Sequence, residues 1–234
     1  MRTIFVDYRI SEEEFENLNY YNLRIIKCPK NNNVYEAISG HPDIQLHLVD
    51  KKTVVVHKNM EIDFIKELES YGYYVICTEN VLNEKYPKDI ILNALTIDNY
   101  FIHNLIYTDP ILLALIKRRK LHLLNVNQGY TKCSSAIINS KAVITSDKGI
   151  ANILIENAFD VLLLPPGDIE LPGLNYGFIG GTCGLISNSK IAFYGNLEKY
   201  LYEYQVKDFL YKHEVEAVYL SKGKLVDRGS ILAK

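Results

Sequence analysis

The chain has 234 residues, of which 48% are hydrophobic and 23% charged, a balance typical of a soluble globular protein with one large or two small domains. The formal net charge of −2 gives no electrostatic reason to expect binding to nucleic acid or to an anionic membrane. No apolar run approaches the ~18 residues of a membrane-spanning helix, and residues 1–10 are too few and too charged for a signal peptide. The cysteines show no CxxC spacing, which predicts reduced thiols in a cytoplasmic protein; they are Cys28, Cys77, Cys133 and Cys183.

The first elements expected along the chain are a strand, a helix and a second strand. Residues 2–10 are rich in β-forming side chains and predict the first strand. Ser11 and Glu14 have the spacing of a capping box, which predicts a short helix directly after it. The apolar run 23–28 predicts the next strand. This first unit lacks a strand in front of residue 2.

Four further units follow, each with two strands joined by a polar turn, then a helix and a closing strand. The strand pairs are 44–49 with 53–57, 90–97 with 100–107, 135–138 with 142–145, and 184–187 with 191–194. Asn59, Asp109 and Asn196 are the expected N-cap residues of three of the helices. The closing strands are 73–78, 121–126, 161–164 and 217–220.

The spacing of these units predicts an internal repeat. The five closing strands begin about 40 to 56 residues apart, within the range of propellers and arrays. A spare strand is expected at 224–232, and it would complete the first unit by lying beside residues 3–8. Such pairing closes a ring and removes exposed sheet edges. The alternative is a set of unrelated βαβ units in an ordinary α/β fold.

Five strand-turn-strand-helix-strand units closed into a ring resemble the pentein fold. That superfamily includes arginine deiminases, dimethylarginine dimethylaminohydrolases and amidinotransferases, and also a non-catalytic ribosome anti-association factor. The run 177–184, Gly-Phe-Ile-Gly-Gly-Thr-Cys-Gly, is similar to the Gly-Gly plus Cys loop in the fifth unit of the enzymes, where the cysteine is the nucleophile. More closely, the chain is similar to an uncharacterised bacterial branch with short members. The resemblance implies a five-bladed α/β propeller, with residues 1–234 forming a single domain.

The chain departs from the pattern of the enzymes at two places. The enzymes carry a His-x-acid motif in the fourth unit, but residues 128–164 contain no histidine, and the only His-x-Asp is His41-Pro42-Asp43 in the second unit. Thr182 stands where the enzymes often have a histidine. A cysteine, a histidine and an acid are therefore all present in a different order along the chain.

Four candidates for catalytic roles lie in segments that enter the units and are expected to face a central channel. Cys183 could attack an amidine or guanidine carbon as a thiolate, or it could be a buried thiol between glycines. Cys133 is the rival nucleophile, and the neighbouring Lys132 would point to the opposite face if both were extended. His41 is the expected acid and base, because imidazole titrates near neutral pH, and Asp43 could orient it or bind a cation.

The remaining candidates are polar or glycine positions in the same entering segments. They are proposed to bind substrate, and they are Asp89, Gln128, Tyr130, Lys132, Gly181 and Thr182. The sequence shows no metal-ligand spacing and no phosphate-binding loop, so no metal and no cofactor are expected.

Two functions remain open from the sequence. The first is binding of a small cationic amidine or guanidine, with hydrolysis or group transfer through a cysteine. The second is a non-catalytic binding module on the same fold for a protein or ribosomal partner, since a fold does not fix a function. Neither nucleic acid nor a membrane is an expected partner, and the oligomeric state is left open.

Overall fold

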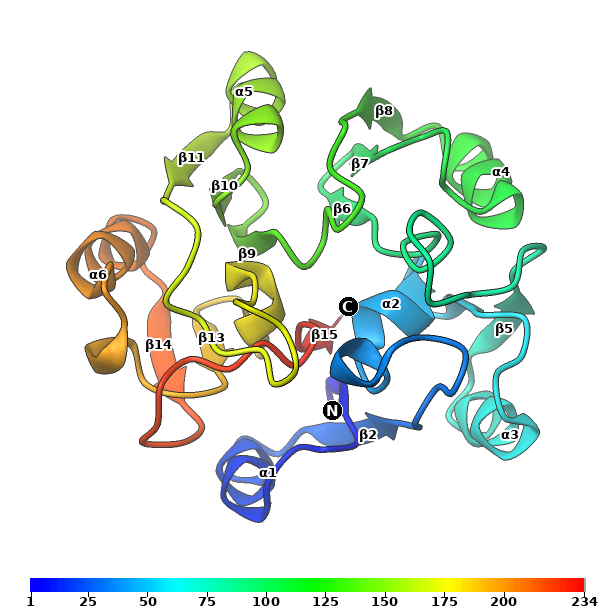
Figure 1. Cartoon of the computed structure of the whole chain (residues 1–234), viewed down its shortest axis with the longest axis horizontal. Coiled ribbons are helices and arrows are strands. Elements are labelled where there is room, and N and C mark those ends of the chain that lie inside the picture. Colours follow the sequence, from blue (N-terminus) through cyan, green and yellow to red (C-terminus); the bar gives the residue numbers. More distant parts are fainter. Residues whose placement is uncertain (234) are drawn as a thin grey trace.

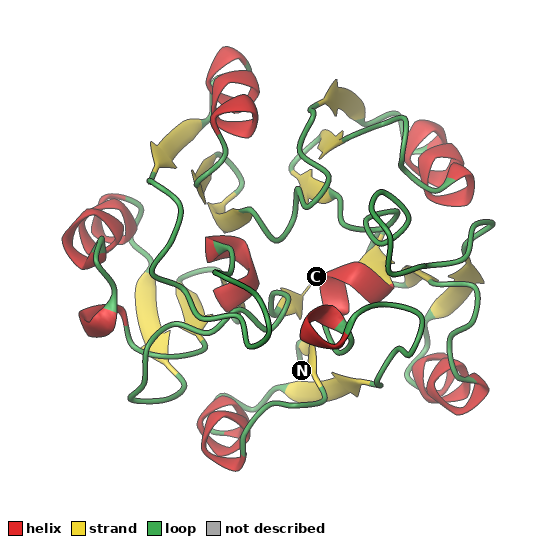
Figure 2. Cartoon of the chain, in the orientation of Figure 1, coloured by secondary structure: helices red, strands yellow, loops and turns green. Residues whose placement is uncertain are grey.

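The computed structural model describes residues 1–233, and the strands in this part of the chain form five separate three-stranded sheets. Figure 1 shows the sheets arranged around a common centre, and Figure 2 shows the longer helices at the periphery. In order, the sheets are β15 (Leu232–Ala233), β1 (Thr3–Asp7) and β2 (Arg24–Cys28); β3 (Leu46–Leu48), β4 (Thr53–Val56) and β5 (Tyr74–Cys77); β6 (Leu95–Ile97), β7 (Tyr100–His103) and β8 (His122–Asn125); β9 (Ser135–Asn139), β10 (Ala142–Thr145) and β11 (Asp160–Leu163); and β12 (Cys183–Leu185), β13 (Lys190–Phe193) and β14 (Glu216–Tyr219). The predicted α/β class with small sheets is confirmed.

Each sheet has the same internal topology. The middle strand pairs antiparallel with an inner strand, which lies nearest the centre, and parallel with an outer strand. Parallel neighbours need a crossover connection, and a helix supplies it in each described sheet. These helices are α1 (Glu12–Asn19), α3 (Ile62–Ser70), α4 (Pro110–Arg118), α5 (Lys148–Glu156) and α6 (Glu203–Lys212). The predicted element order is therefore present.

Local chemistry explains where two of the helices begin. Ser11 and Glu14 form the predicted capping box at the start of α1. At the start of α4, the Asp109 carboxylate accepts the Ile111 amide at 2.9 Å, and Pro110 occupies the first turn. None of the helices within residues 1–233 is long and apolar enough to cross a membrane.

The chain ends meet, but the terminal strand is shorter than expected. β15 pairs antiparallel with β1 through Ile4 with Ala233 and Phe5 with Leu232, as predicted. The expectation of a strand over 224–232 is wrong for most of its length. Gly229 and Ser230 have φ of +72° and +59°, a left-handed backbone that cannot continue an extended strand.

Several other predicted boundaries are also wrong. The strands expected at 44–49 and 90–97 begin only at Leu46 and Leu95. Residues Pro42–Gln45 form the short helix α2 instead, because Pro42 is suited to a first helical turn. Residue 61 rather than Asn59 is the N-cap of α3. Asn196 caps only the short 3₁₀ turn η3 (Leu197–Lys199), and α6 starts four residues after that turn.

Five segments of the chain each lie immediately before an inner strand, and we call them the leading segments. Helix α2 leads into β3, residues 90–94 into β6, residues 128–134 into β9, the 3₁₀ turn η2 (Ile179–Thr182) into β12, and residues 227–231 into β15. The polar side chains at the centre of the molecule come from these segments.

Candidate active site

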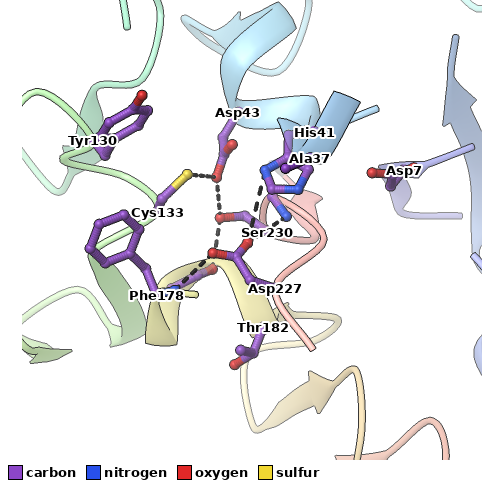
Figure 3. Close-up of polar contacts among 12 residues, drawn as sticks. Asp7, Ala37, His41, Asp43, Tyr130, Cys133, Phe178, Thr182, Asp227 and Ser230 are labelled. Atoms are coloured by element: carbon purple, nitrogen blue, oxygen red, sulfur yellow. Dashed lines mark hydrogen bonds and ion pairs between the residues drawn. The ribbon is translucent and has the colours of Figure 1, made fainter. Parts of the chain in front are cut away.

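The Cys133 thiol is held by two polar partners from other leading segments. Its Sγ donates to Asp43 Oδ2 at 3.1 Å, and it accepts from Asn93 Nδ2 at 3.1 Å. Figure 3 shows the sulfur directed at the Asp43 carboxylate. Asn93 Oδ1 also accepts the backbone amides of Lys132 and Cys133, at 2.9 and 3.1 Å. The side chain of Asn93 therefore fixes both the thiol and the turn that carries it.

His41 completes a compact group with this pair. One ring nitrogen of His41, one carboxylate oxygen of Asp43 and the sulfur of Cys133 all lie within 4.8 Å of one another. These donor types are also those that bind zinc, and among residues 1–233 this is the cluster with the atoms to hold a metal ion. The predicted grouping of His41, Asp43 and Cys133 is thus what the fold brings together.

A second carboxylate lies beside the imidazole. Asp227 Oδ1 is 3.9 Å from His41 Nδ1, and within the described residues neither ring nitrogen makes a hydrogen bond. The Asp227 carboxylate accepts the backbone amides of Phe178 at 2.8 Å and Gly229 at 2.9 Å. Burial raises the pKa of Asp227, and the adjacent His41 opposes that rise.

The glycine-rich run packs closely against Asp227. A Cβ on Gly181 would lie 1.9 Å from Asp227 Oδ1, and one on Gly177 would lie 2.4 Å from Asp227 Cβ. A Cβ on Gly180 would lie 2.5 Å from the Lys132 carbonyl oxygen. Glycine is needed at these positions because no side chain fits between the turn and its neighbours.

Cys183 lies in a different environment from Cys133. It is buried in the apolar cluster that contains Phe193, and its sulfur lies 3.5 Å from the carbonyl oxygen of Ile179. Burial raises the pKa of the Cys183 thiol to about 12 and outweighs Lys132 and Thr182, which act to lower that pKa. Cys183 is not a member of the group formed by His41, Asp43 and Cys133, but it lines the large cavity together with Asp43 and Lys132.

Two cavities border this central layer of polar groups. A small cavity of about 250 Å³ is lined by His41, Cys133 and Asp227, and its aromatic walls are Tyr35, Tyr130, Tyr176 and Phe178. A large cavity of about 560 Å³ is lined by the inner strands and by Asp43, Lys132 and Cys183. Lys132 lines the large cavity and Cys133 the small one. The predicted reason, an extended strand, does not apply, because both residues belong to a turn.

The predicted substrate-binding residues differ in whether they line a cavity. Tyr130 forms a wall of the small cavity, and its hydroxyl bonds the Asp89 carboxylate and, at 3.1 Å, the Tyr35 hydroxyl. Gln128 contacts Asp147 and is not among the residues that line either cavity. Thr182 donates to the Ile179 carbonyl at 2.7 Å and lies apart from the cluster in Figure 3.

The surroundings of the Cys133 sulfur favour the thiol over the thiolate. Burial raises the pKa of Cys133 well above its ordinary value, and the negative charges of Asp43 and Asp227 raise it further. A thiol that donates to a carboxylate is ready to lose its proton when a cation enters and offsets those charges. The small cavity therefore suits a positively charged ligand.

Three residues of this cluster were not identified from the sequence: Asn93, Asp227 and Ser230. Asn93 and Asp227 fell inside expected strands, and Asp227 is followed closely by a glycine, Gly229. A charged residue and a glycine inside a short apolar run are signals of a turn, and they could have placed Asp227 outside the strand.

Comparison with known proteins places the chain in a family and a fold. Residues 5–232 match the family described as "Family of unknown function (DUF6873)". Among curated proteins, none matches the sequence of this chain. Solved structures of guanidino-modifying enzymes are similar over almost the whole chain, at low sequence identity.

Three of these structures illustrate the range. Dimethylarginine dimethylaminohydrolase from Pseudomonas aeruginosa, complexed with citrulline, is 8% identical, with 93% of this chain and 91% of that chain covered and a TM-score of 0.55. Inosamine-phosphate amidinotransferase from Streptomyces griseus is 11% identical over 94% and 79% of the two chains, with a TM-score of 0.58. Agmatine deiminase from C. jejuni is 14% identical over 99% and 80%, with a TM-score of 0.55.

At these identities the likeness is one of fold. The expected resemblance to the pentein superfamily is confirmed by it. The chain therefore belongs to the family of unknown function that its residues 5–232 match, and it has the fold of the pentein enzymes.

Proposed function

We propose that this protein is a cysteine-dependent enzyme that acts on a small amidinium or guanidinium compound bound in the small cavity. The observation that carries the proposal is the Cys133 thiol, which is hydrogen-bonded to Asp43 and lies within 4.8 Å of a His41 nitrogen. A nucleophile with a base and an acid in reach is the signature of covalent catalysis. The fold neighbours named above, which are a dimethylaminohydrolase, an amidinotransferase and a deiminase, support this class of substrate.

The walls of the small cavity suit a flat cation. Asp227 lines the small cavity. Asp43 lines the large cavity, but its Oδ2 contacts the Cys133 thiol of the small one, and its Oδ1 has no hydrogen-bond partner among the described residues. A guanidinium presents several N–H donors in one plane and pairs well with carboxylates. The rings of Tyr130 and Phe178, with centroids 5.9 Å apart and planes tilted by 31°, offer aromatic surface to the same ligand.

The reaction would proceed in two halves. Asp43 takes the Cys133 proton, the sulfur bonds to the amidine carbon, and His41 gives a proton to the leaving nitrogen as the carbon–nitrogen bond breaks. Water, or an amine in the amidinotransferase case, then bonds to the carbon and gives a proton to His41. The carbon–sulfur bond breaks, and the sulfur recovers its proton from Asp43.

The proposal also covers the fold and location of the protein. We propose that the five sheets are the blades of one pentein-type propeller domain, which the pairing of β15 with β1 closes. The proposal also takes the protein to work in the cytoplasm, where its cysteines stay reduced. Asp89 acts through Tyr130, and Gly181 acts through Asp227, so that both support the ligand without touching the reacting carbon.

Binding without turnover is the second candidate. It is favoured by the burial of Cys133 and the contact of its thiol with the Asp43 carboxylate, because both raise the pKa of the thiol and disfavour the reactive thiolate. In that case the cationic ligand would bind to Asp43 and Asp227, and Cys133 would only line the cavity.

Ligand screening followed by product analysis tests the proposal. Arginine, agmatine and simpler amidines are added to the protein, and the melting temperature is measured, because a ligand of the native state raises it. Each compound that binds is then incubated with the protein, and released ammonia or amine is quantified. Release that is lost in Cys133→Ser supports the enzyme, whereas binding without release supports the second candidate. A melting temperature that no cation shifts contradicts both.

A further inference from the structure

A continuous row of five aromatic rings passes through the small cavity, and we call it the aromatic row. The centroids of neighbouring rings are 5.9 to 6.2 Å apart, and the rings are, in order, those of Tyr107, Tyr86, Tyr130, Phe178 and Tyr176. The last three rings line the cavity, and Figure 3 shows two of them beside the Cys133 side chain. A ligand held at Cys133 would therefore meet aromatic surface on its way out of the cavity.

Local contacts hold the rings of this row in place. The Tyr130 hydroxyl bonds the Asp89 carboxylate and, at 3.1 Å, the hydroxyl of Tyr35, which is another wall of the cavity. A Cβ on Gly129 would lie 2.9 Å from Cε2 of Tyr86, so glycine at this position lets that ring lie against Tyr130. Because these walls are already ordered, little conformational entropy is lost when a ligand binds to them.

The outer part of the row is exposed. Tyr86 and Tyr176 are 53% and 44% exposed, and Leu174, a further lining residue, is 48% exposed. The other apolar walls, Ile38 and Leu171, are buried. Large apolar side chains that gather around the opening of a cavity are typical of a ligand-binding surface. A substituent that leaves the cavity is thus surrounded by apolar groups.

The walls of the small cavity offer no permanent positive charge. Among residues 1–233, its lining includes no lysine and no arginine, and the imidazole of His41, 3.9 Å from Asp227, is its one group that can become positive. The ammonium of Lys132 lines the large cavity and donates to Ser230 at 2.9 Å. A ligand carboxylate in the small cavity would meet the Asp227 carboxylate without a cation of its own, and burial of an unpaired charge is costly.

We propose that the ligand of the small cavity is an aryl amidine or aryl guanidine that carries no carboxylate. Its amidinium carbon lies at Cys133, its N–H groups face Asp227, and its ring lies along Tyr130, Phe178 and Tyr176. The inference rests on the proposed function and names the substrate class of the same site. Free arginine, which has a carboxylate and no ring, is outside this class.

Four probes that share one shape separate the charged head from the ring. Benzamidine carries both, acetamidine carries the head without the ring, benzamide is the neutral isostere of benzamidine, and 4-amidinobenzoate adds a carboxylate to the ring. Dissociation constants are measured by isothermal titration with the whole chain. We expect benzamidine to bind at least about tenfold more tightly than each of the other three.

Two substitutions in the aromatic row test which walls hold the ring of the ligand. Tyr176→Ala removes an exposed ring, and Phe178→Leu keeps an apolar side chain but removes the flat face, so both variants should fold. In both we expect the affinity for benzamidine to fall about five- to tenfold and that for acetamidine to stay within about twofold. Tyr211→Ala, which removes an exposed tyrosine from α6, is the matched control and should change neither affinity.

The outcomes distinguish this inference from the proposed function. If acetamidine or 4-amidinobenzoate binds as tightly as benzamidine, or if both ring variants keep the affinity for benzamidine, the inference is overturned and the proposed function stands. If benzamide binds as tightly as benzamidine and both ring variants weaken it, the site for an aromatic ring stands and the cationic ligand of the proposed function fails. A failure of all four probes to bind contradicts both.

Discussion

Two loops of this molecule each carry a cysteine into an inner strand, and they differ in what surrounds the sulfur. The turn before β9 brings Cys133 against the amide of Asn93 and against the carboxylate and imidazole of Asp43 and His41, which come from two other leading segments. The turn before β12 is richer in glycine, yet its Cys183 packs among apolar side chains. Gly177 and Gly181, in the turn before β12, leave room for Asp227. Asp227 in turn lies beside His41 in the cluster that contains Cys133. The run that resembles a nucleophile loop therefore marks a close approach of two backbones, and the proposal of Cys133 as the nucleophile depends on the polar partners of its sulfur.

The largest expected effect separates the two cysteines directly. Cys133→Ser should lower turnover of a bound amidine by on the order of 10³-fold or more, because removal of a nucleophile abolishes the covalent route. Cys183→Ser removes a thiol that fills apolar space, so it should lower the melting temperature and leave the rate constant within a few-fold. Steady-state kinetics and thermal unfolding of both variants check this. An equal loss of activity in the two variants would contradict the assignment of different roles to Cys133 and Cys183.

The next effect tests whether the glycine loop serves Asp227. In Gly181→Ala the new methyl group would overlap the Asp227 carboxylate, so we expect that carboxylate to move and the affinity for a cationic ligand to fall by about 100-fold. Gly223→Ala is the matched control, because a Cβ there meets nothing within 4 Å. Isothermal titration with a ligand found by the screen measures both. An unchanged affinity in Gly181→Ala would show that Asp227 does not contribute to binding of the cationic ligand.

A third prediction concerns pH. The thiolate is the reactive form, and the pKa of Cys133 is raised in the unliganded protein. Its alkylation by a neutral reagent should therefore rise about tenfold per pH unit from pH ~7 to ~9 without reaching the plateau that an ordinary thiol, with a pKa of about 8.5, approaches in this range. A plateau below pH ~8 would show that the buried carboxylates do not act on this sulfur.

The smallest effect is expected at the wall of the small cavity. Tyr130→Phe keeps the ring but deletes the hydroxyl that bonds Asp89 and Tyr35. We expect a change of about 2- to 10-fold in ligand affinity, corresponding to about one hydrogen bond, and little change in the rate of the bound complex. Kinetic measurement of KM and kcat separates these terms. A loss of kcat alone would give Tyr130 a role in the chemistry.

The sequence predicts the scaffold better than the site, and particular residues show why. Alternating and amphipathic patterns locate strands, helices and the meeting of the two termini, because burial on one face leaves a periodic signal. The leading segments carry no such period. Pro42 converts an expected strand start into α2, and the left-handed backbone at Gly229 and Ser230 converts another into the turn that holds Asp227. Contacts between Cys133, Asn93 and Asp43 join residues 40 to 90 positions apart, so no local pattern reveals them.

The most direct test of the central claim compares two small alkylating reagents of the same shape. Chloroacetamidine is cationic and chloroacetamide is neutral, and labelling of each cysteine by each reagent is measured at pH ~7 with a free thiol as reference. Because a bound cation offsets the charges of Asp43 and Asp227, we expect chloroacetamidine to label Cys133 at least about tenfold faster, relative to the free thiol, than chloroacetamide does, and to leave Cys183 unlabelled. Equal relative rates at Cys133, or preferential labelling of Cys183, would contradict the account.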